Sequence, residues 1–145
     1  MKLISPAYGE LEYSESDVIR FPEGLIGFPA SHRFLLLDSP ETSPFRPLQS
    51  VDDPYLVFIT TDPRLIVKNY SISITIEDMK GLGVDKSEDL AIFAICILPE
   101  NYVDATANLR APVLVNHQRM IGRQVILAEN TAFSHHHNIL QAPAQ

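Results

Sequence analysis

The most conspicuous chemical feature of the sequence is the histidine run His135-His136-His137. Residues i and i+2 of a strand point to the same side, so His135 and His137 could together ligate a metal ion. Two ligands do not make a site, and Glu129 is the only acidic residue among the last forty. A metal- or ligand-binding protein that uses His117 as a third ligand is kept as the alternative hypothesis for the function of the chain. The other interpretation of the run is a solvated, pH-sensitive patch.

The remaining reactive side chains do not assemble into a catalytic set. Cys96 lies in the apolar run 90–98, where a buried thiol has a raised pKa and is inert. The adjacent acids Asp52-Asp53 and Glu77-Asp78 accompany turn or cap signals, and the sequence has no Gly-x-Ser-x-Gly elbow. Gly81-Leu82-Gly83 lacks the third glycine of a phosphate-binding loop. We expect a binding module rather than an enzyme, with no catalytic residue, no metal and no cofactor.

Composition narrows the remaining classes of function. The 145 residues include 11 Lys and Arg against 18 Asp and Glu, a net charge of −7. Such a chain is a poor non-specific nucleic-acid binder, because clustered Lys and Arg are needed to neutralise phosphates. One cysteine allows no internal disulfide, the N-terminus lacks a signal-peptide core, and the longest apolar run is too short to cross a bilayer. We expect a cytoplasmic protein, monomeric when free, with neither a nucleic-acid nor a membrane partner.

The elements that carry these side chains are expected to be short strands. The 11 prolines punctuate the chain, and proline is excluded from helix interiors and central strands. The runs between them predict strands at 17–21, 33–37, 45–51, 56–60, 69–75, 90–98, 112–116 and 123–128. One short helix is predicted at 77–82, capped by Ser73 or Thr75 and stopped by Gly81 or Gly83. The predicted fold is all-β, a single small antiparallel β-barrel-like domain over residues 1–140 with a fraying tail at 141–145.

Charge is distributed unevenly along the chain. Residues 1–105 carry 8 basic and 17 acidic side chains. Residues 106–145 carry three arginines, four of the five histidines and Glu129 as the single acid. The asymmetry agrees equally with charged edge strands and with a partner-binding face in the C-terminal part.

Two segments are more specific than composition. The first is Phe21-Pro22-Glu23-Gly24-Leu25-Ile26-Gly27-Phe28, followed by 34–37 and 44–50. The second is Asn108-Leu109-Arg110-Ala111-Pro112-Val113-Leu114-Val115-Asn116, followed by 122–127. In order and spacing they closely resemble the family of the bacterial flagellar assembly factor FliW, over roughly residues 17–139. The Asn-Leu-x-Ala-Pro stretch with the later Gly-x-Gln is the most diagnostic part.

The resemblance implies a non-enzymatic regulator with a small antiparallel β-barrel fold. Proteins like this bind CsrA, a small dimeric RNA-binding translational repressor, and relieve its repression of flagellin mRNA. They also bind flagellin itself. Free flagellin occupies the factor and leaves CsrA to repress, whereas export of flagellin releases the factor to capture CsrA. An acidic domain suits such a basic partner, because charge complementarity raises the rate and specificity of association.

The same segments contain the expected site residues. Eight are expected to hold the fold, with both glycines at positive φ: Phe21, Gly24, Leu25, Gly27, Phe28, Leu109, Ala111 and Pro112. Seven are candidates for protein binding: Asn108, Arg110, Asn116, Arg123, Gln124, His136 and His137. The arginines and histidines among them are expected to face solvent. The two asparagines could instead cap backbone groups, and the glutamine could be a buried, hydrogen-bonded amide.

The C-terminal end departs from the family-like pattern. The family often has an aromatic-Ser-x-Arg-His-Pro ending, whereas residues 133–138 read Phe-Ser-His-His-His-Asn. His136 therefore stands where arginine would be, and Asn138 where proline would be. If this end contacts a partner, an imidazole replaces a guanidinium fork, and the contact becomes weaker or pH-dependent.

Overall fold

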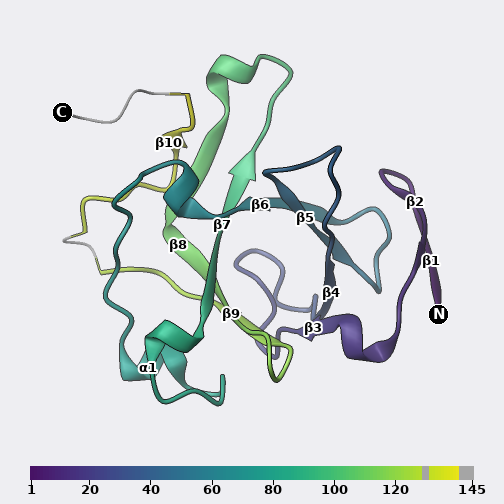
Figure 1. Ribbon diagram of the computed structural model, residues 1–145, viewed down its shortest axis with the longest axis horizontal. Coiled ribbons are helices and arrows are strands. Elements are labelled where there is room, and N and C mark those ends of the chain that lie inside the picture. The colour runs from purple at the N-terminus through teal and green to yellow at the C-terminus, as the bar shows by residue number, and fades with distance from the viewer. Residues whose placement is uncertain (129–130, 141–145) are drawn as a thin grey trace.

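The structure, a computed structural model, describes residues 1–128 and 131–140 and consists mainly of β-strands (Figure 1). An N-terminal hairpin, β1 (Lys2–Ser5) with β2 (Gly9–Glu12), forms a sheet of its own. The main sheet contains β3 (Val18–Arg20), β4 (Arg33–Leu36), β5 (Arg46–Ser50), β6 (Val57–Thr61), β7 (Ala91–Ile97), β8 (Thr106–Asn116), β9 (Ile121–Gln124) and β10 (His137–Asn138). The helical elements are α1 (Ile76–Met79) and the 3-10 turns η1 (Glu15–Asp17), η2 (Pro63–Leu65), η3 (Ser87–Asp89) and η4 (Tyr102–Asp104).

In the described part of the chain, seven strands close into a barrel in the order β8-β7-β6-β5-β4-β3-β9, and β9 returns to β8. The pairings around the ring are antiparallel except the junction of β3 with β9, a parallel bridge between Arg20 and Ile121. β9 pairs with the last part of β8, and β10 pairs with its first part. Closure leaves few strand edges open to solvent. The predicted all-β class and small barrel are confirmed, with one parallel junction in an otherwise antiparallel ring.

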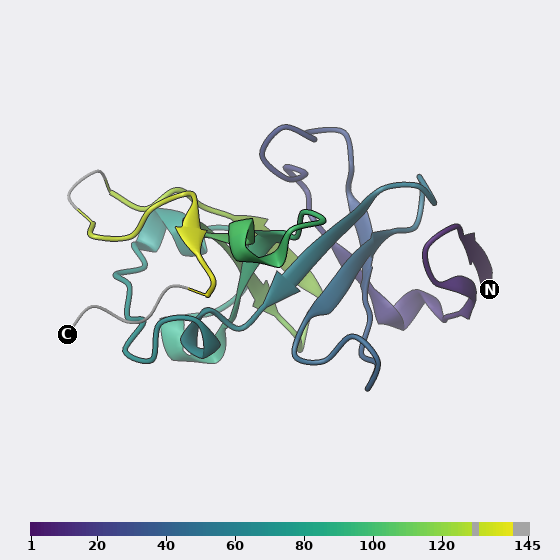
Figure 2. The ribbon, with the colours of Figure 1, turned by 90° about the horizontal axis from the view of Figure 1, so that it is seen from above.

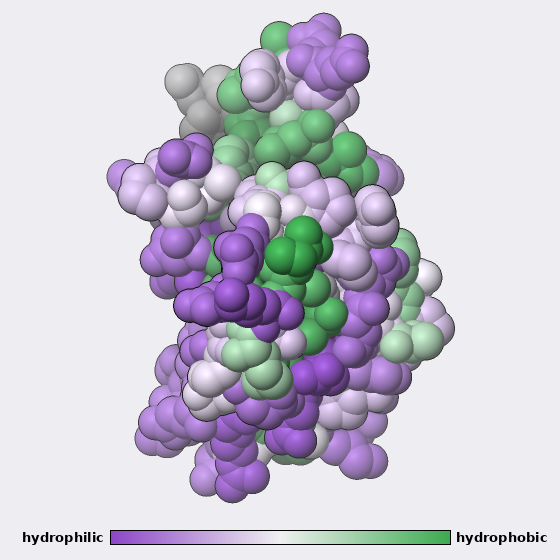
Figure 3. Space-filling view, turned by 90° about the vertical axis from the view of Figure 1, so that its right-hand side faces the viewer, coloured by the Kyte–Doolittle hydropathy of each residue, from purple (hydrophilic) through white to green (hydrophobic). Residues whose placement is uncertain are grey.

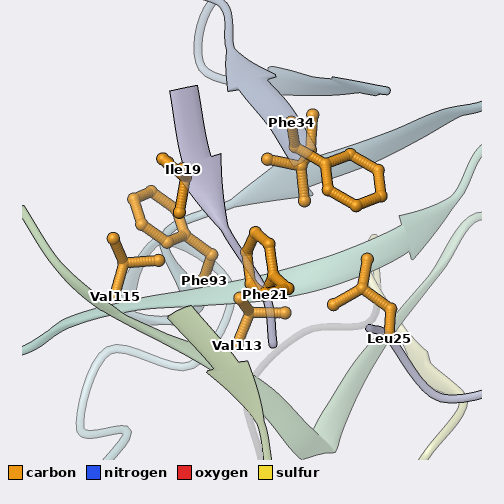
Figure 4. Packing of buried hydrophobic residues seen from close by; sticks show 8 residues of the cluster. Ile19, Phe21, Leu25, Phe34, Phe93, Val113 and Val115 are labelled. Atoms are coloured by element: carbon orange, nitrogen blue, oxygen red, sulfur yellow. The ribbon is translucent and has the colours of Figure 1, made fainter. Parts of the chain in front are cut away.

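The barrel interior is filled by apolar side chains from the inward positions of its strands (Figure 4). Phe21 and Phe34 are fully buried, and their rings meet edge to face with centroids 5.5 Å apart. The buried members of this cluster are Ile19, Phe21, Leu25, Phe34, Leu48, Phe93, Val113 and Val115. A smaller cluster of Leu3, Val18, Leu35 and Val51 joins the N-terminal hairpin to the barrel wall.

Local sequence signals place most of the elements correctly. Five predicted strands correspond to β3, β4, β5, β6 and β7, with no boundary displaced by more than one residue. A helix is confirmed at α1, although it ends at Met79 rather than at 82. The Thr75 hydroxyl accepts from the Asp78 N–H, and the Asp78 carboxylate accepts from the Thr75 N–H. Gly81, with φ of 84°, follows the helix as the predicted stop.

The predicted strand at 69–75 is wrong, because these residues form no ladder. Their alternation is real: Tyr70 is buried, Ile72 and Ile74 are half-buried, and the residues between them are exposed. Period-two patterning reports which side of an extended segment is covered, but it does not report a free strand edge to pair with. Here β7 uses both of its edges for β6 and β8.

Three further boundaries differ from the prediction. β8 begins at Thr106 rather than at 112, and β9 begins at Ile121 rather than at 123 and ends at Gln124 rather than at 128. The N-terminal hairpin was not predicted, and it lies at the opposite end of the molecule from β10 (Figures 1 and 2). The tail prediction for 141–145 lies outside the described residues. Across residues 1–128 and 131–140, no helix is both long and apolar enough to cross a membrane.

Candidate protein-binding site

The Asn-Leu-x-Ala-Pro stretch forms a large bulge in β8. Phe93 of β7 pairs with Val113, yet Ile95, two residues along β7, pairs with Asn108, five residues back along β8. Residues 109–112 therefore have no register partner on β7, and the carbonyls of Arg110 and Pro112 accept instead from the N–H groups of Leu127 and Val125, beyond β9. Pro112 is tolerated inside this long strand because a bulge needs no N–H there. The rule that proline is excluded from central strands therefore has an exception here, at a bulge.

Asn108 supplies the hydrogen bonds that a ladder would otherwise have provided. Its Oδ1 accepts from the backbone N–H of Arg110 at 3.2 Å and of Ala111 at 3.0 Å. The Nδ1 of His135 lies 3.1 Å from the same oxygen. Within the chain, the Asn108 side chain therefore caps backbone N–H groups, which is one of the two roles expected for it.

Two side chains from distant segments hold the carbonyls of the bulge. The Tyr70 hydroxyl donates to the Leu109 carbonyl at 2.8 Å, and burial raises the pKa of Tyr70 to about 12. The Gln124 Nε2 donates to the Ala111 carbonyl at 3.0 Å, while its Oε1 accepts from the Ile26 N–H at 2.9 Å. Gln124 thus connects the bulge to the other diagnostic segment, residues 21–28.

Residues 21–28 form a tight loop that is fixed by two glycines. The N–H and C=O groups of Leu25 and Phe28 bond reciprocally at 3.1 and 2.7 Å around Ile26 and Gly27. Gly24 and Gly27 have φ of 69° and 85°, as predicted. Phe21 and Leu25 point into the core, whereas Phe28 is 40% exposed and Ile26 52% exposed. Among the residues expected to hold the fold, Phe28 thus lies at the surface rather than in the core, where its ring and that of Phe58 meet edge to face with centroids 5.1 Å apart.

Arg110 is the cation that the bulge presents. It is half-buried, and its Nε is a buried donor without a partner in the described structure. Bulges redirect side chains out of the regular pleat, and arginine is enriched among residues that dominate binding energy at interfaces. The neighbouring His136 is exposed, and His137 is half-buried in β10, opposite Ala107. With Asn108, these three residues are the sequence-predicted candidates that the fold gathers around the first part of β8.

Asn116 and Arg123 lie at the other end of β8 and β9, where they bind the α1 segment. The Nδ2 of Asn116 donates to the Leu82 carbonyl at 2.7 Å. Arg123 donates through Nη1 to the Glu77 carbonyl at 2.7 Å and pairs through Nε with the Glu23 carboxylate at 2.9 Å. Both side chains are thus engaged inside the chain, and any contact of theirs with a partner stays a prediction.

Asn138, the residue in the position of the family-like proline, also has an internal role. Its Nδ2 donates to the Val103 carbonyl and its Oδ1 accepts from the Leu140 N–H, both at 2.9 Å. These bonds attach the segment after β10 to η4.

The reactive groups remain dispersed in the folded chain. Among residues 1–128 and 131–140, no group of three or more His, Cys, Asp or Glu side chains could hold a metal ion. The alternative hypothesis of a histidine metal site therefore gains no support from the geometry. Cys96 is buried, and burial raises its pKa to about 12, which disfavours the reactive thiolate.

The role of Tyr70 was missed by sequence reasoning. The signal was present as an aromatic residue that carries a hydroxyl on the buried face of an alternating segment, since a buried tyrosine usually finds a hydrogen-bond partner. The identity of that partner, a carbonyl 39 residues away in sequence, could not be read from the pattern.

Comparison with known proteins gives one consistent result. The family model described as FliW protein matches residues 2–139. A protein of Caldanaerobacter subterraneus named flagellar assembly factor FliW is 39% identical, over 97% of this chain and 94% of that protein. The protein of the same name from Natranaerobius thermophilus is 38% identical, over 88% and 85%. A crystal structure of the flagellar assembly factor FliW superposes with a TM-score of 0.89 at 32% identity, over 99% of this chain and 100% of that one.

Proposed function

The chain belongs to the FliW family of flagellar assembly factors, and on that premise we propose that it is a cytoplasmic, non-enzymatic regulator. It binds the translational repressor CsrA, relieves repression of flagellin mRNA, and binds flagellin in a partner switch. The observation that carries this proposal is the family match over residues 2–139, nearly the whole length of the chain.

The charge of the chain supports a basic protein partner. CsrA binds RNA, and RNA-binding proteins carry clustered Lys and Arg. A domain with a net charge of −7 is attracted to such a surface, which raises the association rate. The same charge argues against direct binding of the mRNA by this chain.

Arg110 and His136 are the side chains that we propose as partner contacts. Asn108, Tyr70 and Gln124 fix the backbone of the bulge and so act as positioning residues for Arg110. A preorganised backbone lowers the entropic cost of binding, because the loop is already in its bound conformation.

Calorimetric titration of the purified protein into CsrA, with and without saturating flagellin leader RNA, tests the proposal. We expect a sub-micromolar Kd, which corresponds to about −8 kcal/mol or better. If excess RNA abolishes binding of this protein to CsrA, the two compete directly. If a ternary complex forms, the protein acts on RNA binding allosterically, from a separate surface of CsrA. A parallel titration with flagellin should give a complex, and prior saturation with flagellin should abolish binding to CsrA. Absence of both complexes at micromolar concentrations would refute the proposed function.

The site assignment is tested by Arg110→Ala, with Arg20→Ala as the matched control. Arg20 is exposed and lies on β3, outside the bulge. We expect Arg110→Ala to weaken binding of CsrA or flagellin by about tenfold or more, and the control to leave both unchanged. Equal affinities of the two variants for both partners would remove Arg110 from the interface.

A further inference from the structure

A groove lies between the N-terminal hairpin, which forms one end of the molecule (Figures 1 and 2), and the neighbouring strands of the barrel. Two adjoining hollows of about 320 and 660 Å³ form this groove, and they share Leu11, Leu37 and Asp38. The groove runs along β2 and the end of β4 into the 37–47 connection. It lies at the opposite end of the molecule from β10.

The floor of the groove is apolar and incompletely covered. Leu11, Leu36 and Leu37 line it and are each half-buried. Figure 3, which views the molecule from the hairpin side, shows apolar surface enclosed by hydrophilic side chains. Covering such half-exposed apolar surface with a partner is favourable, because it removes the surface from water.

The rim of the groove is acidic. Glu12, Asp17, Asp38 and Glu41 line it, and all four are exposed. Within residues 1–128 and 131–140, Glu12, Asp38 and Glu41 form no ion pair. Their charges are therefore available to a partner.

Two basic side chains, Arg46 and His117, also reach the groove, and among the described residues neither forms an ion pair with the acidic rim. The Nε of Arg46 donates to the Leu37 carbonyl at 3.3 Å, which keeps the guanidinium against the floor. Burial and the nearby Arg46 lower the pKa of His117, so its ring is uncharged at neutral pH. The groove as a whole carries net negative charge.

We propose that this groove binds a basic segment of the RNA-binding partner, with Lys or Arg side chains on the acidic rim and an apolar side chain on the leucine floor. This inference rests on the proposed function, which supplies a partner that carries clustered Lys and Arg. Charge complementarity selects this occupant over the others. A second copy of the chain would bring the same carboxylates face to face, and an anionic membrane surface would repel them.

The test is a charge reversal that leaves the fold intact. Asp38 and Glu41 are exposed, and no side-chain hydrogen bond or ion pair of theirs occurs among the described residues. The double variant Asp38→Lys/Glu41→Lys is compared with Asp85→Lys/Glu88→Lys, which changes the net charge equally at exposed positions beside η3. Thermal melting of both variants checks that each remains folded.

Titration into CsrA at two salt concentrations then separates the outcomes. We expect the groove variant to bind about tenfold or more weakly and with a shallower salt dependence, while the control changes less than about threefold. Equal weakening of both variants means that only net charge matters and overturns the groove. Unchanged binding by the groove variant also overturns it. Failure of the wild-type protein to bind CsrA at all refutes the CsrA part of the proposed function, and this occupant of the groove with it.

Discussion

Replacing Tyr70 by phenylalanine tests whether the β8 bulge is held by side chains from elsewhere in the chain. The Tyr70 hydroxyl donates to the Leu109 carbonyl at 2.8 Å, and the two residues are 7% and 0% exposed. The substitution keeps the ring, which packs on Phe133 with centroids 4.6 Å apart, and removes only the hydroxyl. The perturbation is therefore one hydrogen bond in a buried site.

The expected magnitude follows from the carbonyl that is left behind. A buried acceptor without its donor costs about 1–3 kcal/mol of folding free energy. For a chain of this length, each kcal/mol lowers Tm by roughly 2–4 °C. The Tyr70→Phe variant should therefore melt roughly 2–12 °C below the wild-type protein.

The assay is thermal unfolding followed by circular dichroism, with Tyr102→Phe as the matched control. Tyr102 is 73% exposed, and its hydroxyl forms no hydrogen bond within the described structure. The control should melt with the wild-type protein. A Tyr70→Phe variant that melts within about 1 °C of wild type would show that the bulge does not depend on this hydroxyl. Equal losses in both variants would refute the assignment of the effect to burial.

Three further predictions follow from other buried or constrained groups. Gly24→Ala should lower the urea midpoint clearly more than Gly27→Ala, because a Cβ at Gly24 would meet the backbone of the 28–29 segment whereas Gly27 faces open space; the positive φ alone costs about 1–2 kcal/mol at either position, and equal losses would contradict the close approach. The Cys96 thiol should react with an aromatic disulfide reagent at pH 8 only after unfolding, since burial raises its pKa to about 12; rapid modification of the folded protein would contradict this. Burial and Arg46 lower the pKa of His117, so its neutral form is favoured in the folded state, and the stability that this shift represents is present above the ordinary pKa near 6.5 and is lost as pH falls below it. The His117→Gln variant should therefore show less loss of stability than wild type between about pH 7 and pH 5 in urea unfolding, and parallel losses would exclude His117 as the group responsible.

Much of the fold could be predicted because its signals are local. Short apolar runs between the prolines located β3 to β7, and the cap expected at Ser73 or Thr75 located α1. Both signals act over a few residues, since a strand repeats every two and a cap spans four. The same locality explains the error at 69–75, where alternation described the buried side correctly but ladder formation depended on whether a neighbouring strand had a free edge.

The candidate site was predictable as a set of residues but not as an arrangement. Asn108, Arg110 and Gln124 were identified from their segments, yet nothing local separated a partner contact from an internal bond. The structure shows Asn108 and Gln124 bonded to backbone groups of the bulge and its neighbouring loop, while the buried Nε of Arg110 has no partner among residues 1–128 and 131–140. Arg123 was expected to face solvent, but it is held by Glu23 and the Glu77 carbonyl.

The sequence by itself determined the class of the domain, most of its strands, the position of its helix and the burial of Cys96. Each of these depends on the hydrophobic effect and on hydrogen bonds between residues close in the chain. Only the tertiary structure decided that Tyr70, Gln124 and Ile26 meet at the β8 bulge and that the hairpin leaves an acidic groove at the far end. The physical reason is that backbone groups excluded from a ladder must find donors and acceptors wherever barrel closure brings them, and closure is a property of the whole ring.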